Sequence, residues 1–170
     1  MQNLLVMGVS FMLLSACFSP RSSKRMNQFF DPSARSIADT QSDMNFDLNQ
    51  YQWQNRILLV FAPSEQSPAY QQQRQDWRSQ TQAMQDRDLK QVELLATGIS
   101  RVNGQPITEQ SAERLRKQFD VSSETFAVVL IGKDGTEKRR FSEPVASTEL
   151  FNTIDAMPMR QQEMRDRSNQ

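Results

Sequence analysis

Two uninterrupted apolar runs constrain the fold of this chain more than any other feature of its sequence. The first run spans residues 57–62 and ends at Pro63, and the second spans residues 126–131. An apolar run of this length without polar alternation is typical of a strand that is buried on both faces of a sheet. The chain is therefore expected to contain a sheet that helices cover on both sides.

The first run is followed by a helical pattern. Ser67 and Pro68 are typical of an N-cap and a first helical residue, and they predict a glutamine-rich helix that continues to Asp88. Its apolar residues recur every seven positions and form one narrow stripe: Tyr70, Trp77 and Met84. The stripe is expected to pack on the sheet, because a helix that covers a sheet needs an apolar face; the alternative is self-association with a second copy.

The remaining elements follow in a regular order. A second strand is predicted over residues 92–99, and a helix after the N-cap Thr108. Residues 126–131 form the next strand, and Asp134-Gly135 predicts a tight hairpin into one more strand. The apolar spacing of residues 150–157 predicts the last helix.

This order predicts the fold class. A strand–helix–strand unit requires a parallel pair of strands, and the hairpin adds an antiparallel strand. The expected architecture is α/β: a three-layer sandwich in which helices flank a mixed central sheet, with the connectivity of the thioredoxin fold.

The N-terminus has the pattern of a lipoprotein signal. An apolar stretch over residues 4–16 ends in Leu14-Ser15-Ala16-Cys17 and is shorter than the roughly 20 residues of a membrane-spanning helix. We expect Cys17 to become the acylated first residue of the mature protein and to bind membrane lipid. Two alternatives remain: an uncleaved N-terminal anchor, or an ordinary signal peptide with an unrelated cysteine.

The predicted domain organisation follows from this signal. Residues 1–16 are expected to be the signal peptide, and residues 17–45 the lipidated cysteine and a flexible tether. The thioredoxin-like domain is predicted over residues 46–164, and a polar C-terminal tail over residues 165–170. The expected location is the cell envelope, on its non-cytoplasmic side, facing the periplasm in a Gram-negative cell.

The amino-acid composition excludes or disfavours several classes of function. The chain has no histidine, which excludes Ser-His-Asp catalysis and His-ligated zinc. Its single cysteine excludes an intramolecular disulfide and a cysteine-rich metal site. Lys plus Arg and Asp plus Glu balance at 20 each, which disfavours nucleic acid as a partner. We therefore expect no metal and no cofactor.

Residues in the last third of the chain carry a resemblance to a known family. Leu130-Ile131-Gly132-Lys133-Asp134-Gly135 and Ser142-Glu143-Pro144-Val145, with residues 149–151, 154–155 and 157–160, resemble the P-DUDES family. This thioredoxin- and peroxiredoxin-like domain of unknown function occurs in bacteria and in animal extracellular sushi-repeat proteins. The resemblance covers residues 51–164 and implies the fold, but it implies no established activity.

The sequence departs from thiol-active relatives of the thioredoxin fold. Those proteins have cysteine at the turn from the first strand into the first helix, where the helix dipole lowers the thiol pKa. Here that turn is Pro63-Ser64-Glu65-Gln66-Ser67-Pro68, and residues 122–126 lack the proline that normally faces it. We therefore expect that this domain has no catalytic residue and that the protein is not an enzyme.

Two groups of residues are candidates for binding. The first is the turn with Glu65, Gln66 and Ser67, and the second is the set Glu143, Asp155 and Arg160. The second set can form either a structural ion-pair network or a recognition patch. The expected recognition region of the domain is the loop over residues 63–68 or the arm over residues 159–164.

The sequence favours a non-catalytic binding or scaffolding lipoprotein with an envelope protein as its partner. The alternative is a thiol-redox or peroxide-stress accessory enzyme that acts through partner thiols or through a free Cys17.

Overall fold

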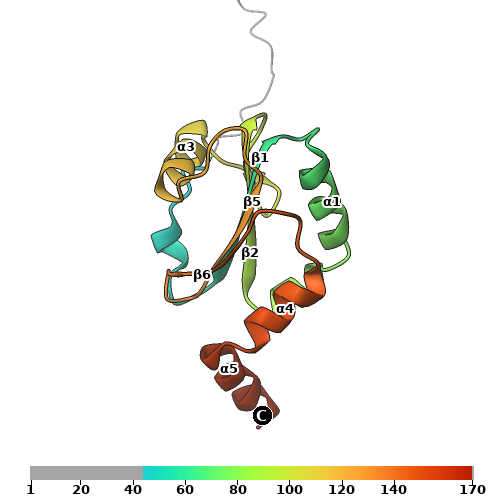
Figure 1. Cartoon of the computed structure of the whole chain (residues 1–170). Helices are drawn as coiled ribbons and strands as arrows, with labels where there is room; N and C mark the ends of the chain where they lie inside the picture. The colour runs from blue at the N-terminus through green and yellow to red at the C-terminus, as the bar shows by residue number, and fades with distance from the viewer. Residues whose placement is uncertain (1–43, 170) are drawn as a thin grey trace, which may run out of the picture. The chain divides into compact units, whose positions relative to one another are not determined.

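The structure, a computed structural model, describes residues 44–169 (Figure 1). These residues form one six-stranded mixed sheet with helices on both faces. The strands are β1 (Arg56–Ser64), β2 (Leu89–Thr97), β3 (Arg101–Val102), β4 (Gln105–Pro106), β5 (Ala127–Ile131) and β6 (Glu137–Phe141). The helices are α1 (Pro68–Trp77), α2 (Thr81–Asp86), α3 (Glu109–Gln118), α4 (Ser147–Asp155) and α5 (Pro158–Ser168), and a 3-10 turn, η1 (Leu48–Tyr51), precedes β1.

The two apolar runs form the central pair of strands. The strand order across the sheet is β4-β3-β2-β1-β5-β6. β1 pairs parallel with β2 and antiparallel with β5, in a register that places Leu59 opposite both Val92 and Val129. Residues 57–62 and 127–131 are all buried, which confirms the prediction that both runs are strands covered on two faces.

Alternate side chains of β1 enter two separate cores, as the two-residue period of a strand requires. Ile57, Leu59 and Phe61 pack in the core under α3 and η1. The intervening side chains, from Leu58 to Ala62, pack in the core under α1, α2 and α4. Figure 1 shows α3 on one side of the sheet and α1 and α4 on the other. The predicted α/β sandwich with thioredoxin-like connectivity is therefore confirmed.

The predicted hairpin connects β5 to β6. Gly135 has a φ of +78°, a value that glycine adopts without steric cost. The Asp134 carboxylate accepts a hydrogen bond from the Thr136 backbone N–H at 3.2 Å, and Gly132 N–H donates to the Thr136 carbonyl. These local bonds fix the antiparallel register of the two strands.

The single long helix predicted up to Asp88 is wrong, because the segment forms two helices, α1 and α2. Ser79 and Thr81, both weak helix formers, lie at the break. The stripe packs in the core, as expected: its residues Tyr70, Trp77 and Met84 are all buried in one cluster.

Two further boundaries differ from expectation. β2 begins at Leu89 rather than at Val92, because Lys90 and Gln91 continue the parallel pairing with β1 despite their polarity. α5 extends to Ser168, through most of the stretch predicted as a polar tail. Pro158 therefore begins this helix as well as ending the previous one, since proline is tolerated in a first turn.

The predictions for the N-terminal part lie outside the described residues. These are the signal peptide, the lipidated Cys17 and nearly all of the tether. Within residues 44–169, none of the helices has the length and apolar character that crossing a membrane requires. In the same part of the chain, His, Cys, Asp and Glu residues form no cluster of three or more that could hold a metal ion.

Candidate functional site

The predicted binding turn connects β1 to α1 at the carboxyl end of the central strand. The Glu65 carboxylate accepts a hydrogen bond from Arg101 Nη1 at 2.8 Å, so the turn is tied to β3 by an ion pair. Gln66 is exposed. Ser67 occupies the predicted N-cap position of α1, but its hydroxyl caps no backbone N–H. Glu65 thus links the turn to β3, and Gln66 is the exposed one of the three candidate residues.

Arg116 of α3 is a residue that sequence reasoning missed. Its Nη2 donates to the carbonyl oxygens of Ala62 at 2.6 Å and Leu94 at 2.7 Å, and its Nη1 donates to the Ser122 carbonyl at 3.0 Å. One guanidinium therefore joins the ends of β1 and β2 to the loop before β5. Arg116 follows Ala112 by four residues and so lies on the same, inward face of the helix. This spacing was the sequence feature that could have predicted its burial.

The environment of Arg116 is unusual for a cation. Its side chain lies over the Phe61 ring, with 5.7 Å from the guanidinium carbon to the ring centre. Within residues 44–169 no carboxylate forms an ion pair with it, and burial lowers its pKa. Carbonyl dipoles are therefore its partners. The clamp therefore has a structural role, because it holds the carboxyl ends of β1 and β2 to the loop before β5.

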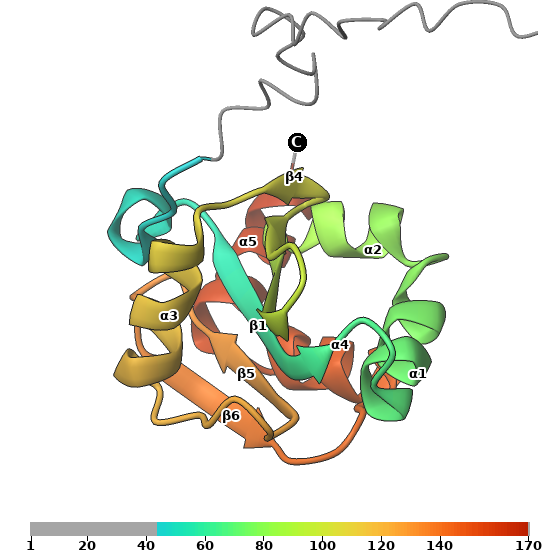
Figure 2. The ribbon, with the colours of Figure 1, turned by 90° about the horizontal axis from the view of Figure 1, so that it is seen from above.

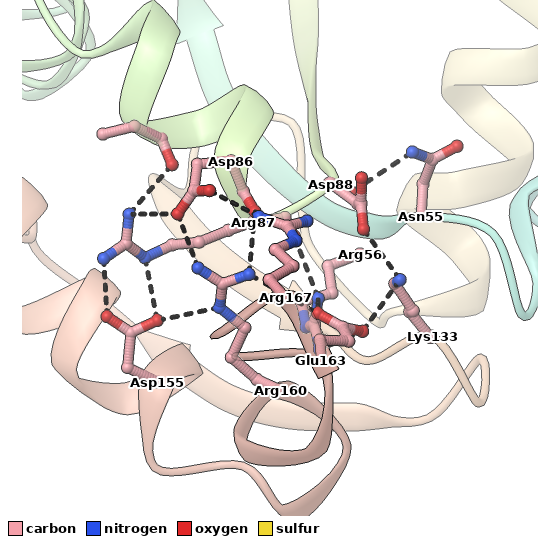
Figure 3. A network of polar contacts seen from close by, with 11 residues as sticks. Asn55, Arg56, Asp86, Arg87, Asp88, Lys133, Asp155, Arg160, Glu163 and Arg167 are labelled. Atoms are coloured by element: carbon pink, nitrogen blue, oxygen red, sulfur yellow. Dashed lines mark hydrogen bonds and ion pairs between the residues drawn. The ribbon is translucent and has the colours of Figure 1, made fainter. Parts of the chain in front are cut away.

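The second predicted set is brought together only in part. Arg160 Nε lies 3.2 Å from Asp155 Oδ1, and both side chains belong to a larger network (Figure 3). Glu143 is exposed in the loop between β6 and α4 and makes no ion pair with a described residue. Asp155 and Arg160 thus take part in an ion-pair network, and Glu143 does not.

One half of the network surrounds Arg160, whose side chain is 3% exposed. Arg160 Nη2 bonds the Asp86 carboxylate at 2.5 Å, and Arg87 binds Asp155 through two hydrogen bonds. Arg167 reaches the same Asp86 carboxylate from the last turn of α5. Partial burial would raise the pKa of Asp86, but the hydrogen bond from Arg160 and the nearby guanidinium charges lower it overall.

The other half surrounds Glu163 of α5. Its two oxygens accept from the buried Arg56 at 3.1 and 3.2 Å, and Lys133 Nζ lies 2.8 Å away. Lys133 also bonds Asp88 at 2.8 Å. Burial would raise the pKa of Glu163, yet Arg56 and Lys133 lower it overall. The network joins α5 to the starts of β1 and β2, and its charges largely satisfy one another. This pairing favours a structural role over recognition.

A groove of about 680 Å³ lies between the two helices α1 and α2 and the strands β2 and β3. Figure 2 shows α1 and α2 on the same side of the β3–β4 hairpin. Its buried lining includes Trp77, Met84 and Leu89. Its cationic lining consists of Arg74, Arg78, Lys90 and Arg101. Sequence reasoning gave no signal for this groove, because its walls come from segments that only the fold brings together.

Comparison with known proteins places the domain in a family. Residues 47–163 match the family described as Domain of unknown function (DUF4174). Coiled-coil domain-containing protein 80 of Danio rerio is 29% identical over 133 residues, which cover 69% of this chain and 15% of that protein. Sushi repeat-containing protein SRPX2 of Xenopus laevis is 29% identical over 111 residues, which cover 64% of this chain and 24% of the relative.

Human sushi repeat-containing protein SRPX is 29% identical over 120 residues, which cover 69% of this chain and 26% of its own length. The chain thus spans about a quarter or less of the length of these relatives. The expected resemblance to sushi-repeat proteins is confirmed. Because the match extends over most of the described domain, the chain belongs to the DUF4174 family, a domain of unknown function.

Proposed function

We propose that this chain is a lipid-anchored bacterial member of the family, in the P-DUDES form, and that its domain is a non-catalytic binding or scaffolding module of the cell envelope. The observation that carries the non-catalytic part is the Arg116 clamp at the carboxyl ends of β1 and β2. Thiol-active proteins of this fold need an accessible cysteine at this edge. The only cysteine of the chain, Cys17, lies outside the domain.

The alternative nucleophiles at this edge lack an activating base. Ser64 and Ser67 are near the turn, and a serine hydroxyl needs a neighbouring base to react at neutral pH. The nearest candidate, Glu65, is already paired with Arg101 at 2.8 Å. A role in binding an envelope protein fits these contacts better than a role in catalysis. The relatives add to this by analogy, because they contain the same domain as a small part of longer chains.

The anchor is tested by the intact mass of the protein extracted from its native membrane, beside a Cys17→Ala variant. The expected result is the loss of residues 1–16 and the added mass of acyl chains, both abolished by the substitution. Two or three acyl chains give a durable attachment, since a single chain binds only marginally. An uncleaved leader or an unmodified Cys17 thiol would contradict the anchor.

The non-catalytic role is tested separately with hydrogen peroxide and dithiothreitol. The purified protein is expected to consume peroxide no faster than its Cys17→Ala variant or buffer alone. Faster consumption that disappears in Cys17→Ala would favour the alternative, a peroxide-stress accessory enzyme acting through a free Cys17. Faster consumption that persists in Cys17→Ala would overturn the non-catalytic proposal in another way, because it would show a chemistry that does not need sulfur.

A further inference from the structure

We propose that α5 is a releasable arm of the domain, which turns about Ala156 and Met157 and leaves as one unit while the sheet and its covering helices stay folded. Figure 1 shows α5 at the end of the domain, beyond α4. The proposal concerns a conformational change within this chain and does not depend on the proposed binding role.

The helix α5 contributes no residue to the apolar interior. Neither of the two cores contains a side chain from Pro158–Ser168. Arg160 is the only buried residue of the helix, and its side chain is charged. The two methionines of α5 are exposed, Met159 at 41% and Met164 at 38%. Release of α5 therefore leaves the buried residues of both cores in place, and a segment with few buried apolar contacts is the kind that opens locally.

The Glu163 carboxylate attaches one side of the helix. It pairs with Arg56 of β1 at 3.1 Å and with Lys133 after β5 at 2.8 Å, and Arg160 of the same helix lies 3.6 Å away. Lys133 is also paired with Asp88, so it keeps a carboxylate when α5 leaves. Arg56 is 1% exposed and loses its sole carboxylate partner among the described residues. Separating this pair is costly and favours the closed form at neutral pH.

Asp86 and Asp155 attach the other side of the helix. Both accept hydrogen bonds from Arg160, and Asp86 also accepts one from Arg167. Arg87 pairs with both carboxylates and stays with the domain, so both keep a cation after release. Because the two carboxylates are 46% and 29% exposed, water can replace the departing guanidinium groups. This half of the network therefore opens at a lower cost than the Glu163 half.

Pro158 separates the arm from the helix before it. A residue that precedes proline is disfavoured in the helical conformation, and Met157 is extended, with a ψ of 137°. The helices α4 and α5 therefore do not merge into one rigid rod, and Ala156 and Met157 form the connection about which α5 can turn. An isolated helix of 11 residues is marginal in water, so the released arm should lose its helical hydrogen bonds.

Acid should favour release, because carboxylates carry the attachment. The charged groups that face one another here, from every element packed against α5, are Arg56 on β1, Asp86 and Arg87 at the end of α2, Asp88 before β2, Lys133 after β5, Asp155 on α4, and Arg160, Glu163 and Arg167 on α5 itself.

The sign of the pH dependence follows from two of these carboxyls. Partial burial raises the pKa values of Glu163 and Asp86, but the facing cations prevail and lower both in the closed form. Release returns them to their ordinary values of 4.5 and 3.8. The closed form is thus favoured above these values and loses this advantage as the pH falls through the lower values of the closed form. Moving from pH 7 to pH 4 should raise the open fraction about fivefold.

Native-state hydrogen exchange of the ¹⁵N-labelled full chain, followed by NMR, tests the arm. Protection factors correct for the intrinsic effect of pH on exchange. The α5 amides of residues 162–167 are expected to share one protection factor, at least about tenfold lower than that of the β1 amides. Their protection should depend only weakly on urea, because release exposes little surface compared with global unfolding. It should fall about fivefold from pH 7 to pH 4.

Two variants separate release of the arm from unfolding of the whole domain. Glu163→Gln should lower the protection of the α5 amides roughly threefold to tenfold at pH 7 and weaken its pH dependence. The matched control is Thr108→Ala, which removes an N-cap hydrogen bond of α3. It should lower the protection of the β1 amides about fivefold and leave that of the α5 amides unchanged.

Three results would overturn the inference. Equal protection of α5 and β1, falling together in Thr108→Ala, would mean that the helix opens only when the whole domain unfolds. Protection that declines steadily toward Ser168 would show fraying of a chain end instead of release of a unit. Equal protection of α5 in the wild type and in Glu163→Gln would show that the Glu163 pairs do not hold the arm.

Discussion

Arg160 and Asp155 face each other across the break between α4 and α5, with 3.2 Å between Arg160 Nε and Asp155 Oδ1. The same guanidinium also bonds the Asp86 carboxylate and the Asp86 carbonyl at the end of α2. Arg160 is the only buried residue of α5. The helix is therefore attached to the domain mainly through charge, and its attachment should respond to mutation and pH as charge does.

Substitution of Arg160 by methionine should destabilise the domain. The change leaves Asp86 and Asp155 close together with less positive charge between them, and breaking a buried pair from one side costs about 3–5 kcal/mol. Because both carboxylates are partly exposed, we expect about 2–3 kcal/mol in the free energy of unfolding, measured with urea. Arg165→Met on the exposed face of α5 is the control, with a loss below about 0.5 kcal/mol. Equal losses for the two variants would show that the network adds nothing specific.

The stability of the domain should fall as the pH falls below about 4.5. The folded-state pKa values of Asp86 and Glu163 lie below their ordinary values of 3.8 and 4.5, so the unfolded chain takes up protons first. The contribution of these carboxylates is thus present above the unfolded pKa and is lost as the pH falls through the folded pKa. Urea unfolding from pH 7 to pH 3 measures this loss.

The variant Glu163→Gln should show a weaker pH dependence than the wild type over the same range. Glu113→Gln provides the control, since Glu113 is exposed on α3 and makes no ion pair with a described residue. If Glu163→Gln retained the full acid dependence of the wild type, the network around α5 would not be its source.

Two predicted N-caps differ in the structure and should differ in their effect on stability. The Thr108 hydroxyl accepts a hydrogen bond from the Ser111 N–H at 3.3 Å and shares another with the Ser111 hydroxyl at 2.9 Å. Thr108→Ala should therefore cost about 1 kcal/mol of unfolding free energy. Ser67→Ala should cost less than about 0.5 kcal/mol, because its hydroxyl caps nothing. Thermal unfolding of both variants makes the comparison, and a larger cost at Ser67 would contradict it.

These caps also show how far the sequence could predict the structure. Apolar runs identified β1 and β5, because a short apolar run of this kind is typical of a strand that is buried on both faces. Local chemistry identified the Thr108 cap and the turn at Asp134, since each depends on residues a few positions apart. The position of Ser67 before α1 was equally predictable, but its hydroxyl caps no backbone N–H, which the local sequence did not indicate.

The buried polar residues were the part that the sequence could not predict. Gln73 lies in a glutamine-rich segment, yet its amide alone is buried and forms two hydrogen bonds with the Val145 backbone, at 2.7 and 2.8 Å. Arg56 binds Glu163, which is 107 residues away in the chain. Periodicity assigns such side chains to the surface, because it contains no information on partners that are distant in sequence. The groove beside Trp77 was missed for the same reason.

Substitution of Arg116 tests the observation that supports the non-catalytic part of the proposed function. Arg116→Met would leave three carbonyl oxygens, those of Ala62, Leu94 and Ser122, without their guanidinium donors. The bonds to Ala62 and Leu94 are buried, and each unsatisfied buried acceptor costs about 1–3 kcal/mol, but loss of the desolvated charge offsets part of this. We therefore expect a net loss of about 2–4 kcal/mol in urea unfolding. Arg116→Lys should fall between the wild type and Arg116→Met, because an ammonium cannot reproduce the planar fork that reaches three acceptors.

Amide hydrogen exchange adds a local measure that a general loss of stability would not produce. The Ser122 carbonyl accepts from both Arg116 and the Thr125 N–H, the latter at 3.2 Å. In Arg116→Met the Thr125 amide should exchange faster relative to the amides of β5, because the loop before that strand loses its attachment. Lys117→Met, one position along on the exposed face of α3, should change neither measurement. Unchanged stability and exchange in Arg116→Met would mean that this side chain does not hold the ends of β1 and β2 to the loop before β5. The non-catalytic proposal would then lose the observation that supports it.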